Sequence, residues 1–314
     1  MKEKQMTEVQ RVVSNIKTLG NEKFLKADIL DVMLSLEKEI INYTFAGQCE
    51  AKKLMDCEDY FLQKNRVLGN PAKDEIRKFM VDSKKLHNLI KAEISGRRGE
   101  EKAFSSFENI KQSHLVLKNV ELAEGDTKTE LDAVVITSKC ITIVEVKNTS
   151  RDVYINENGN YYRTGEFLKW DCNIAEKMKL REAMLKRILS KSGYEWVEIK
   201  SVVVFTDSRI EVQNKYKGLK TCFVSQLPYI IAKNGFNICL SDKDMASIRD
   251  AIELSRVSAE YYLDFDIEQY KRNFAELVVK INASEQRKEN SFVSRVASLF
   301  CSKIKHTVGV AAAL

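Results

Sequence analysis

The stretch Glu130–Asn148, ELDAVVITSKCITIVEVKN, decides the fold that we expect for this chain. It contains two runs of mostly β-branched residues, which favour strands, on either side of the dipeptide Ser138-Lys139. We predict that the two runs form an antiparallel hairpin with a tight turn at this dipeptide. In this register Val134 pairs with Ile143.

Two acidic residues face each other in the predicted hairpin. The register places Asp132 opposite Glu145, and the alternation of side chains along a strand puts both of them, with Lys147, on the apolar face of the hairpin. Two carboxylates directly across from each other repel, and burying them is costly. A bound divalent cation, assisted by the lysine, removes both difficulties. The stretch therefore predicts a functional site in which Asp132 and Glu145 share a metal ion.

A Glu-x-Lys pair has little meaning by itself. The same pair also occurs at Glu50–Lys52 and at Glu198–Lys200, and on a strand such a pair is usually a solvated edge. The acid across the hairpin and the apolar arms distinguish the pair at Glu145. A register slip of two residues would keep the face but change the partners, since Ser-Lys is not a favoured two-residue turn.

The composition is that of a soluble, helix-rich protein. The chain has 314 residues, of which 44% are hydrophobic and 31% charged, with 12 Gly and 2 Pro, and this length allows two domains. The formal charge of +6 permits a polyanionic partner at a local groove. The 7 Cys form no CxxC motif, which favours reduced thiols over a structural zinc site. The polar N-terminus and the lack of a long apolar run predict a cytoplasmic protein without signal peptide or membrane span.

Changes of pattern divide the chain into four segments. They are a helical bundle or hairpin at 1–95, an α/β domain at 96–240, C-terminal helices at 241–290 and an amphipathic tail at 291–314. In the first segment Met33, Leu36 and Ile40 have the spacing of a seam between packed helices. This seam would pack on the rest of the chain, on a second copy or on a protein partner. The tail is expected to dock on protein, with an anionic membrane surface as the alternative.

The α/β segment is predicted from alternating strand and helix patterns. Gly96–Gly99 is expected to break the preceding helix and open a new one, and a loop is expected at Glu121–Lys128. The expected strands, besides the central hairpin, are His114–Val120, Asp152–Asn156, Tyr161–Thr164, Ser201–Thr206 and Thr221–Ser225. The expected helices are Glu166–Ser192 and Leu227–Lys233, followed by helices from Ser241 and over Ile267–Ile281.

Three motifs in this order resemble the NERD (nuclease-related) domain, which is assigned to the PD-(D/E)XK nuclease superfamily. They are GRRGEEKAF at Gly96–Phe104, TELDAVVIT at Thr129–Thr137 and ITIVEVKN at Ile141–Asn148. The resemblance covers roughly residues 96–231. It implies a restriction-endonuclease-like mixed sheet flanked by helices, here with an all-helical N-terminal extension.

The resemblance also implies roles for four residues. By position, Glu100 matches the helical glutamate of the family, Asp132 the acid of the second strand, and Glu145 and Lys147 its E-x-K motif. Asp132 and Glu145 would hold Mg²⁺ or Mn²⁺, and Glu100 would brace the metal or the lysine as the third member of the metal set. Lys147 would orient the attacking water or stabilise the transition state.

The helix after the sheet departs from the family pattern, which has an Asn-Pro pair and a Gln. Asn173 fits, but Ile174 replaces the proline and Lys177 stands in place of the glutamine. Lys177 joins Arg97 and Arg98, just before the helical glutamate, as a candidate contact to nucleic acid.

The expected function is a metal-dependent nuclease that hydrolyses phosphodiester bonds, with DNA as the expected substrate. The first rival is a non-catalytic module that binds nucleic acid or protein on the same fold. A binding-only protein has no physical reason to keep an unfavourable acid pair, so the intact set of four favours the enzyme. The second rival is a membrane-surface or oligomeric scaffold led by the N-terminal seam and the tail.

Overall fold

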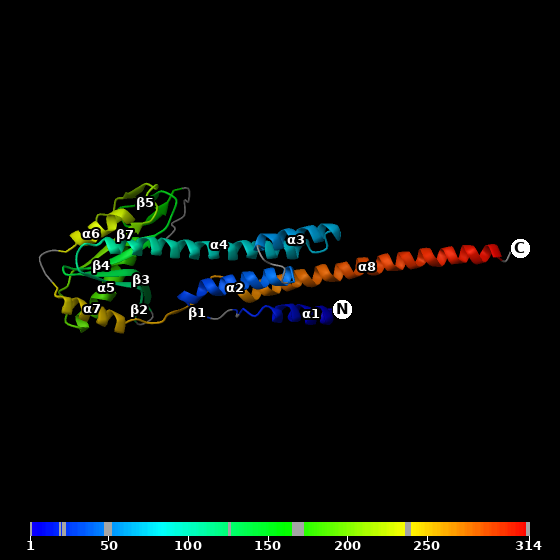
Figure 1. Cartoon of the computed structure of the whole chain (residues 1–314), viewed down its shortest axis with the longest axis horizontal. Coiled ribbons are helices and arrows are strands. Elements are labelled where there is room, and N and C mark those ends of the chain that lie inside the picture. The colour runs from blue at the N-terminus through cyan, green and yellow to red at the C-terminus, as the bar shows by residue number, and fades with distance from the viewer. Residues whose placement is uncertain are drawn as a thin grey trace. The chain divides into compact units, whose positions relative to one another are not determined.

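The structure is a computed structural model that describes residues 2–18, 20, 23–46, 52–124, 127–164, 173–235 and 240–311, with side chains described from 5 to 123 and from 127 to 293 within these ranges. The chain forms two compact units (Figure 1). One unit comprises Met1–Lys91 and Glu260–Leu314, and the other comprises Ala92–Ala259. The four segments predicted from the sequence were consecutive along the chain. The first unit instead combines the N-terminal residues with the C-terminal ones.

The first unit is helical, as expected. It contains α1 (Lys2–Asn15), α2 (Lys26–Thr44), α3 (Leu54–Val67), the first part of α4 (Lys73–Ser105), α8 (Ile267–Ala311) and a short antiparallel pair, β1 (Lys23–Leu25) with β10 (Glu260–Tyr262). The predicted seam residues Met33, Leu36 and Ile40 are all buried in it. Phe79 stacks on Tyr270 with ring centroids 5.8 Å apart. Aromatic packing of this kind supports a structural core.

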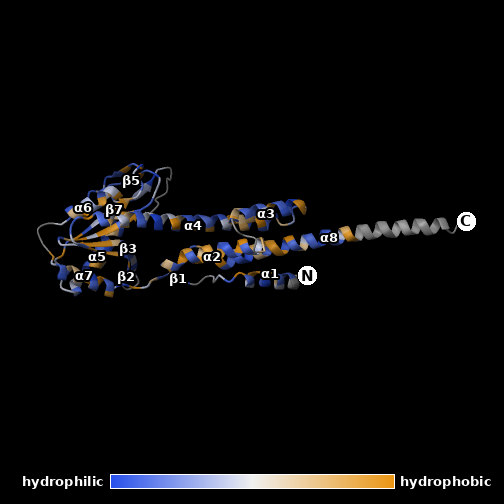
Figure 2. Cartoon of the chain, viewed as in Figure 1, coloured by the Kyte–Doolittle hydropathy of each residue, from blue (hydrophilic) through white to orange (hydrophobic). Residues whose placement is uncertain are grey.

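The second unit is a mixed sheet covered by helices on both faces, which confirms the predicted fold class. Its five strands lie in the order β2 (His114–Glu124), β3 (Thr127–Thr137), β4 (Ile141–Lys147), β7 (Ile199–Phe205) and β9 (Lys220–Phe223). The first three are antiparallel neighbours, and β7 and β9 run parallel to β4. Figure 2 shows the hydrophobic colouring of the central strands, in agreement with their burial.

Two helical layers cover this sheet. One face packs on α5 (Ile174–Lys191) and α7 (Asp242–Leu254). The other packs on the end of α4, on the 3₁₀ turn Ser106–Asn109 and on α6 (Leu227–Lys233). A small second sheet has the order β6 (Tyr161–Arg163), β5 (Val153–Ile155) and β8 (Val212–Asn214).

The central hairpin has the predicted register. Val134 pairs with Ile143 and Ile136 with Ile141. The turn at Ser138-Lys139 is supported by Thr137, whose Oγ1 accepts hydrogen bonds from the backbone N–H groups of Lys139 and Cys140, both at 3.3 Å. The threonine side chain thus satisfies two backbone N–H groups of the turn and stabilises a turn that the Ser-Lys dipeptide alone does not favour.

The predicted helix break at Gly96–Gly99 is wrong. Helix α4 runs without interruption from Lys73 to Ser105, because helix interiors tolerate a glycine at a cost of about 1 kcal/mol. Gly99 has another purpose, since a Cβ added there would lie 2.6 Å from the Cβ of Asn148. The glycine lets the helix backbone approach the end of β4.

Two further boundaries differ from the sequence expectation. The predicted loop at Glu121–Lys128 is wrong, because β2 continues to Glu124 and its pairing with β3 includes Leu122, which is buried. The expected second C-terminal helix over Ile267–Ile281 continues to Ala311 as part of α8. The helix predicted from Glu166 is described only from Ile174, as residues 165–172 lie outside the described part.

The tail lies mostly outside the residues whose side chains are described. Its backbone belongs to α8 as far as Ala311, so its docking surface stays a prediction. Within the part of the chain that the structure describes, no helix is both long and apolar enough to cross a membrane.

The two glycines of α4 provide a matched test of the close approach. Gly96→Ala adds a methyl group with nothing within 4 Å, so it should raise the free energy of unfolding by up to about 1 kcal/mol through helix propensity. Gly99→Ala should lower it by about 1–3 kcal/mol, because the methyl group meets Asn148. Urea unfolding monitored by circular dichroism measures both. Equal stability of the two variants would show that α4 is not held tightly at Asn148.

Candidate functional site

The acid pair lies where β3 and β4 part. The two strands pair from Ile136 opposite Ile141 to Ala133 opposite Val144, and the next residues along them are Asp132 and Glu145. The Asp132 Oδ2 atom accepts a hydrogen bond from the backbone N–H of Val146 at 2.6 Å. This bond places the Asp132 carboxyl beside the E-x-K segment.

Glu145 is buried and surrounded by positive charge. Its side chain is 3% exposed. Its Oε1 atom lies 3.1 Å from Lys147 Nζ and 3.4 Å from Lys177 Nζ, and its Oε2 atom forms a short ion pair with Arg181 Nη1. Burial acts to raise the pKa of Glu145, but the charges of Lys147, Arg181 and Lys177 outweigh it and hold the pKa at about 2. Glu145 is therefore ionised.

Asp132 is in the opposite electrostatic state. Its side chain is partly exposed, yet protein atoms surround it densely. This burial, and next the negative charge of Glu145, raise the pKa of Asp132 to about 8, against the Val146 hydrogen bond and the charge of Arg181. The two acids thus divide their roles: one keeps its charge and the other tends to keep its proton.

Arg181 is the main member of the site that the sequence interpretation missed. Its side chain is 4% exposed, and its Nε donates a hydrogen bond to Thr129 Oγ1 at 3.3 Å. Arg181 occupies the buried stripe of α5, between Met178 and Leu185. An arginine at a core position of an amphipathic helix needs a buried acid, and that signal was available in the sequence.

The other predicted residues lie on α4 and α5. Glu100 lies near enough that its charge adds to the rise in the pKa of Asp132. Lys177 contacts Glu145 while its side chain stays 40% exposed. Arg97 pairs with Glu93 at 3.4 Å on α4, and Arg98 is exposed. Lys177 is therefore brought to the acid pair, and Arg97 has an acidic partner of its own.

A small polar network fixes α4 to the end of β4. The Asn148 Nδ2 atom donates to the carbonyl and the hydroxyl of Ser95 at 2.7 and 2.9 Å. The Thr206 hydroxyl donates to Asn148 Oδ1 in a short contact, and the Thr206 N–H donates to the Lys147 carbonyl at 3.2 Å. These bonds set the position of the Glu100 helix relative to the acid pair.

The acids do not form a ready-made metal cage. Within the described residues, no group of three or more His, Cys, Asp or Glu side chains is placed to hold a metal ion. The role of Glu100 as a third ligand stays a prediction. Two carboxylates nevertheless fit Mg²⁺, which is commonly held by one or two protein carboxylates and keeps several waters.

A comparison with family models decides the kind of domain. Residues 95–206 match the nuclease-related domain, NERD. The match confirms the resemblance drawn from the three motifs. The domain is of the general PD-(D/E)XK superfamily kind. It covers a little over a third of the chain and includes Glu100, Asp132, Glu145 and Lys147.

The NERD match begins at Ser95 and ends at Thr206, the two residues that hydrogen-bond Asn148. The comparisons with curated proteins and with solved structures found no match.

The unequal states of the acid pair predict a pH-dependent effect of Asp132→Asn in EDTA. The unfolded chain loses the Asp132 proton near the ordinary pKa of 3.8, whereas the folded protein keeps it up to about 8. Ionisation therefore costs stability as the pH rises through this window. Asparagine cannot ionise, so the variant should be no more stable than wild type near pH 4 and more stable by at least about 1.4 kcal/mol at pH 8, the equivalent of one pKa unit.

Chemical unfolding at both pH values measures this difference. Asp207→Asn is the control, because the hydrogen bond from Arg209 lowers the pKa of Asp207 and its substitution gives no gain that grows with pH. A gain from Asp132→Asn that is independent of pH would contradict the unequal titration of the pair.

Proposed function

We propose that residues 95–206 carry a divalent-metal-dependent nuclease centre that hydrolyses phosphodiester bonds, with DNA as the expected substrate. The observation that carries the proposal is the apposition of Asp132 and Glu145 across two neighbouring strands, with Lys147 two residues further on. The NERD match supports the nuclease-related character of this arrangement.

The donor atoms suit a hard cation. Asp132 and Glu145 would hold Mg²⁺ or Mn²⁺ through carboxylate oxygens, leaving positions for water and a substrate phosphate. When bound, the ion would lower the pKa of a water molecule and neutralise charge on the phosphate. Burial, and next the charge of Glu145, raise the pKa of Asp132, so an added positive charge at the pair would favour the ionised form that can act as a ligand.

Each cation near Glu145 has a separate task in this proposal. Arg181 is buried and orients the Glu145 carboxylate from α5. Lys147, whose side chain is 19% exposed, is placed to donate a hydrogen bond to the attacking water or to the charged phosphate oxygens. Lys177 is the most exposed of the three and can turn from Glu145 to a substrate phosphate.

The second candidate function is a non-catalytic module that binds nucleic acid or protein. One observation favours it: three cations from the chain itself already neutralise Glu145. In that case the acid pair is a structural ion network, and no metal is needed to hold it.

A cleavage assay separates the two functions. Single- and double-stranded DNA and RNA are incubated with the protein in Mg²⁺, Mn²⁺ or EDTA, and cleavage is expected only with a divalent ion. Asp132→Asn and Glu145→Gln should lower the turnover by at least about 10²–10³-fold, and Lys147→Ala should lose most turnover while keeping metal binding.

Glu198→Gln is the matched control. Glu198 and Lys200 form another Glu-x-Lys pair, but they pair with each other at side-chain exposures of 33% and 41%, well above the 3% exposure of Glu145. This variant should cleave like wild type. Binding of nucleic acid without cleavage in any divalent ion would favour the binding module.

A further inference from the structure

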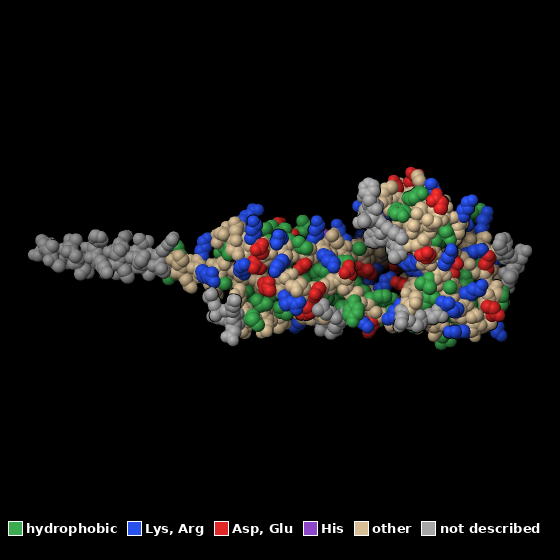
Figure 3. Space-filling view, turned by 180° about the vertical axis from the view of Figure 1, so that it is seen from behind, with side chains coloured by type: hydrophobic (Ala, Val, Ile, Leu, Met, Phe, Trp, Pro, Cys, Tyr) green, Lys and Arg blue, Asp and Glu red, His purple; other side chains and the backbone are tan. Residues whose placement is uncertain are grey.

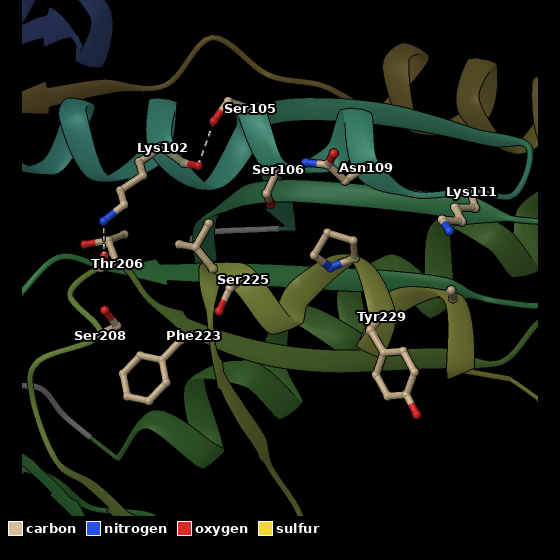
Figure 4. A pocket seen from close by; sticks show the side chains of 13 residues that line it. Lys102, Ser105, Ser106, Asn109, Lys111, Thr206, Ser208, Phe223, Ser225 and Tyr229 are labelled. Carbon is tan, nitrogen blue, oxygen red and sulfur yellow. Dashed lines mark hydrogen bonds between the residues drawn. The ribbon is translucent and has the colours of Figure 1, made fainter.

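A cavity of about 700 Å³ lies on the α4 and α6 side of the sheet (Figure 4), where Lys102 and Thr206 lie at one end of the view and Lys111 and Tyr229 at the other. Its volume lies in the usual range of ligand sites, about 300–1,000 Å³. Its walls come from the last turn of α4, the turn after it, the loop after β7, and α6. Neither Asp132 nor Glu145 lines this cavity.

The charge of the lining favours an anion. Two lysines, Lys102 and Lys111, line the cavity, and none of its described lining residues is Asp or Glu. On the face shown in Figure 3, basic and acidic side chains are interspersed over the surface. A second cavity, beside Trp196, likewise mixes three lysines with three glutamates. The first cavity differs in that the charged residues of its described lining are all lysines.

An aromatic ring is exposed at the Lys111 end of the cavity. Tyr229 on α6 is 62% exposed, and Lys233 Nζ lies 4.3 Å from the centre of its ring. Phe223 contributes a second aromatic side chain to the lining. Aromatic rings next to positive charge are the usual elements of single-strand recognition, because an unpaired base stacks on the ring while its phosphates meet the cations.

Backbone contacts connect the cavity to the acid pair. The Thr206 N–H donates to the Lys147 carbonyl at 3.2 Å, and the Thr206 carbonyl accepts a short hydrogen bond from Lys102 Nζ. The cavity lies on the α4 and α6 face of the sheet, whereas Lys177 and Arg181 of α5 meet Glu145 from the other face. A strand with its phosphate at the acid pair would therefore reach the cavity by turning round the ends of β4 and β7 at Thr206.

We propose that this cavity binds a single-stranded segment of the nucleic acid that is cleaved at the acid pair. A base stacks on Tyr229, and Lys102 and Lys111 contact phosphates. The inference rests on the proposed nuclease function, because it assigns the path of the same substrate.

The test measures binding in EDTA, where no metal-dependent cleavage interferes. Fluorescence anisotropy is recorded with labelled oligo-dT and oligo-rU of about 15 nucleotides, within the site sizes of single-strand-binding folds. Lys111→Glu and Tyr229→Ala should each raise Kd about 5–10-fold. Lys111→Glu should also reduce the slope of log affinity against log salt by about 0.7, whereas Tyr229→Ala should leave that slope unchanged.

The second cavity supplies matched controls. Lys186→Glu and Trp196→Ala change a lysine and a 47% exposed aromatic residue there, and both should bind like wild type. All four side chains are exposed, and thermal melting checks the fold. Lys111→Gln repeats the charge test if the glutamate variant lowers the melting temperature.

The outcomes separate this inference from the proposed function. Wild-type affinity in Lys111→Glu and Tyr229→Ala, or no binding of either oligonucleotide by wild type, overturns the inference even if wild type cleaves. Weaker binding by these two variants alone supports the cavity as the strand site. If wild type then cleaves nothing in Mg²⁺ or Mn²⁺, the site stands as a binding site and the nuclease function fails. The tighter of the two oligonucleotides identifies DNA or RNA.

Discussion

The ion network around Glu145 is the interaction on which the site depends. A buried carboxylate is tolerated only with compensating charge and hydrogen bonds, and here Lys147, Lys177 and Arg181 provide that charge from one strand and one helix. These cations keep Glu145 ionised, whereas burial, and next the negative charge of Glu145, raise the pKa of Asp132. The hairpin thus stores an electrostatic conflict that an added cation would relieve.

The packing around the hairpin keeps this conflict in place. Asn148 joins the end of β4 to Ser95 on α4 and to Thr206 after β7. Gly99 allows the helix to approach that closely. Three segments that are far apart in the sequence therefore meet at one asparagine, and they hold the Glu100 helix close enough for its charge to act on Asp132.

The sequence predicted what depends on local pattern. Alternation and a tight turn are local, so the register that pairs Val134 with Ile143 and Ile136 with Ile141 could be predicted from Glu130–Asn148. The helix break predicted at Gly96 and Gly99 was wrong for the same reason. A glycine is a local helix-breaking signal and carries no information about the partner on which α4 packs. The extension of β2 beyond Val120 likewise depends on its partner strand rather than on its own residues.

The rest of the site depends on contacts between distant segments. Arg181 meets Glu145 across 36 positions of sequence, and Lys102 meets Thr206 across 104. An arginine on the buried face of a helix predicts an acidic partner, but the sequence does not identify which acid it is. The cavity gives no sequence signal, because its lysines and its tyrosine come from separate elements and each looks like an ordinary surface residue.

A divalent-ion titration tests whether Asp132 and Glu145 share a metal ion. Isothermal calorimetry with Mn²⁺ is carried out on wild type and on Asp132→Asn, with circular dichroism to verify that both are folded. Relief of the acid-pair repulsion by a shared ion predicts saturable binding to wild type and its loss or strong weakening in the folded variant. No binding by wild type, or equal affinity of the two proteins, would contradict a metal shared by Asp132 and Glu145 and leave the pair as a structural ion network.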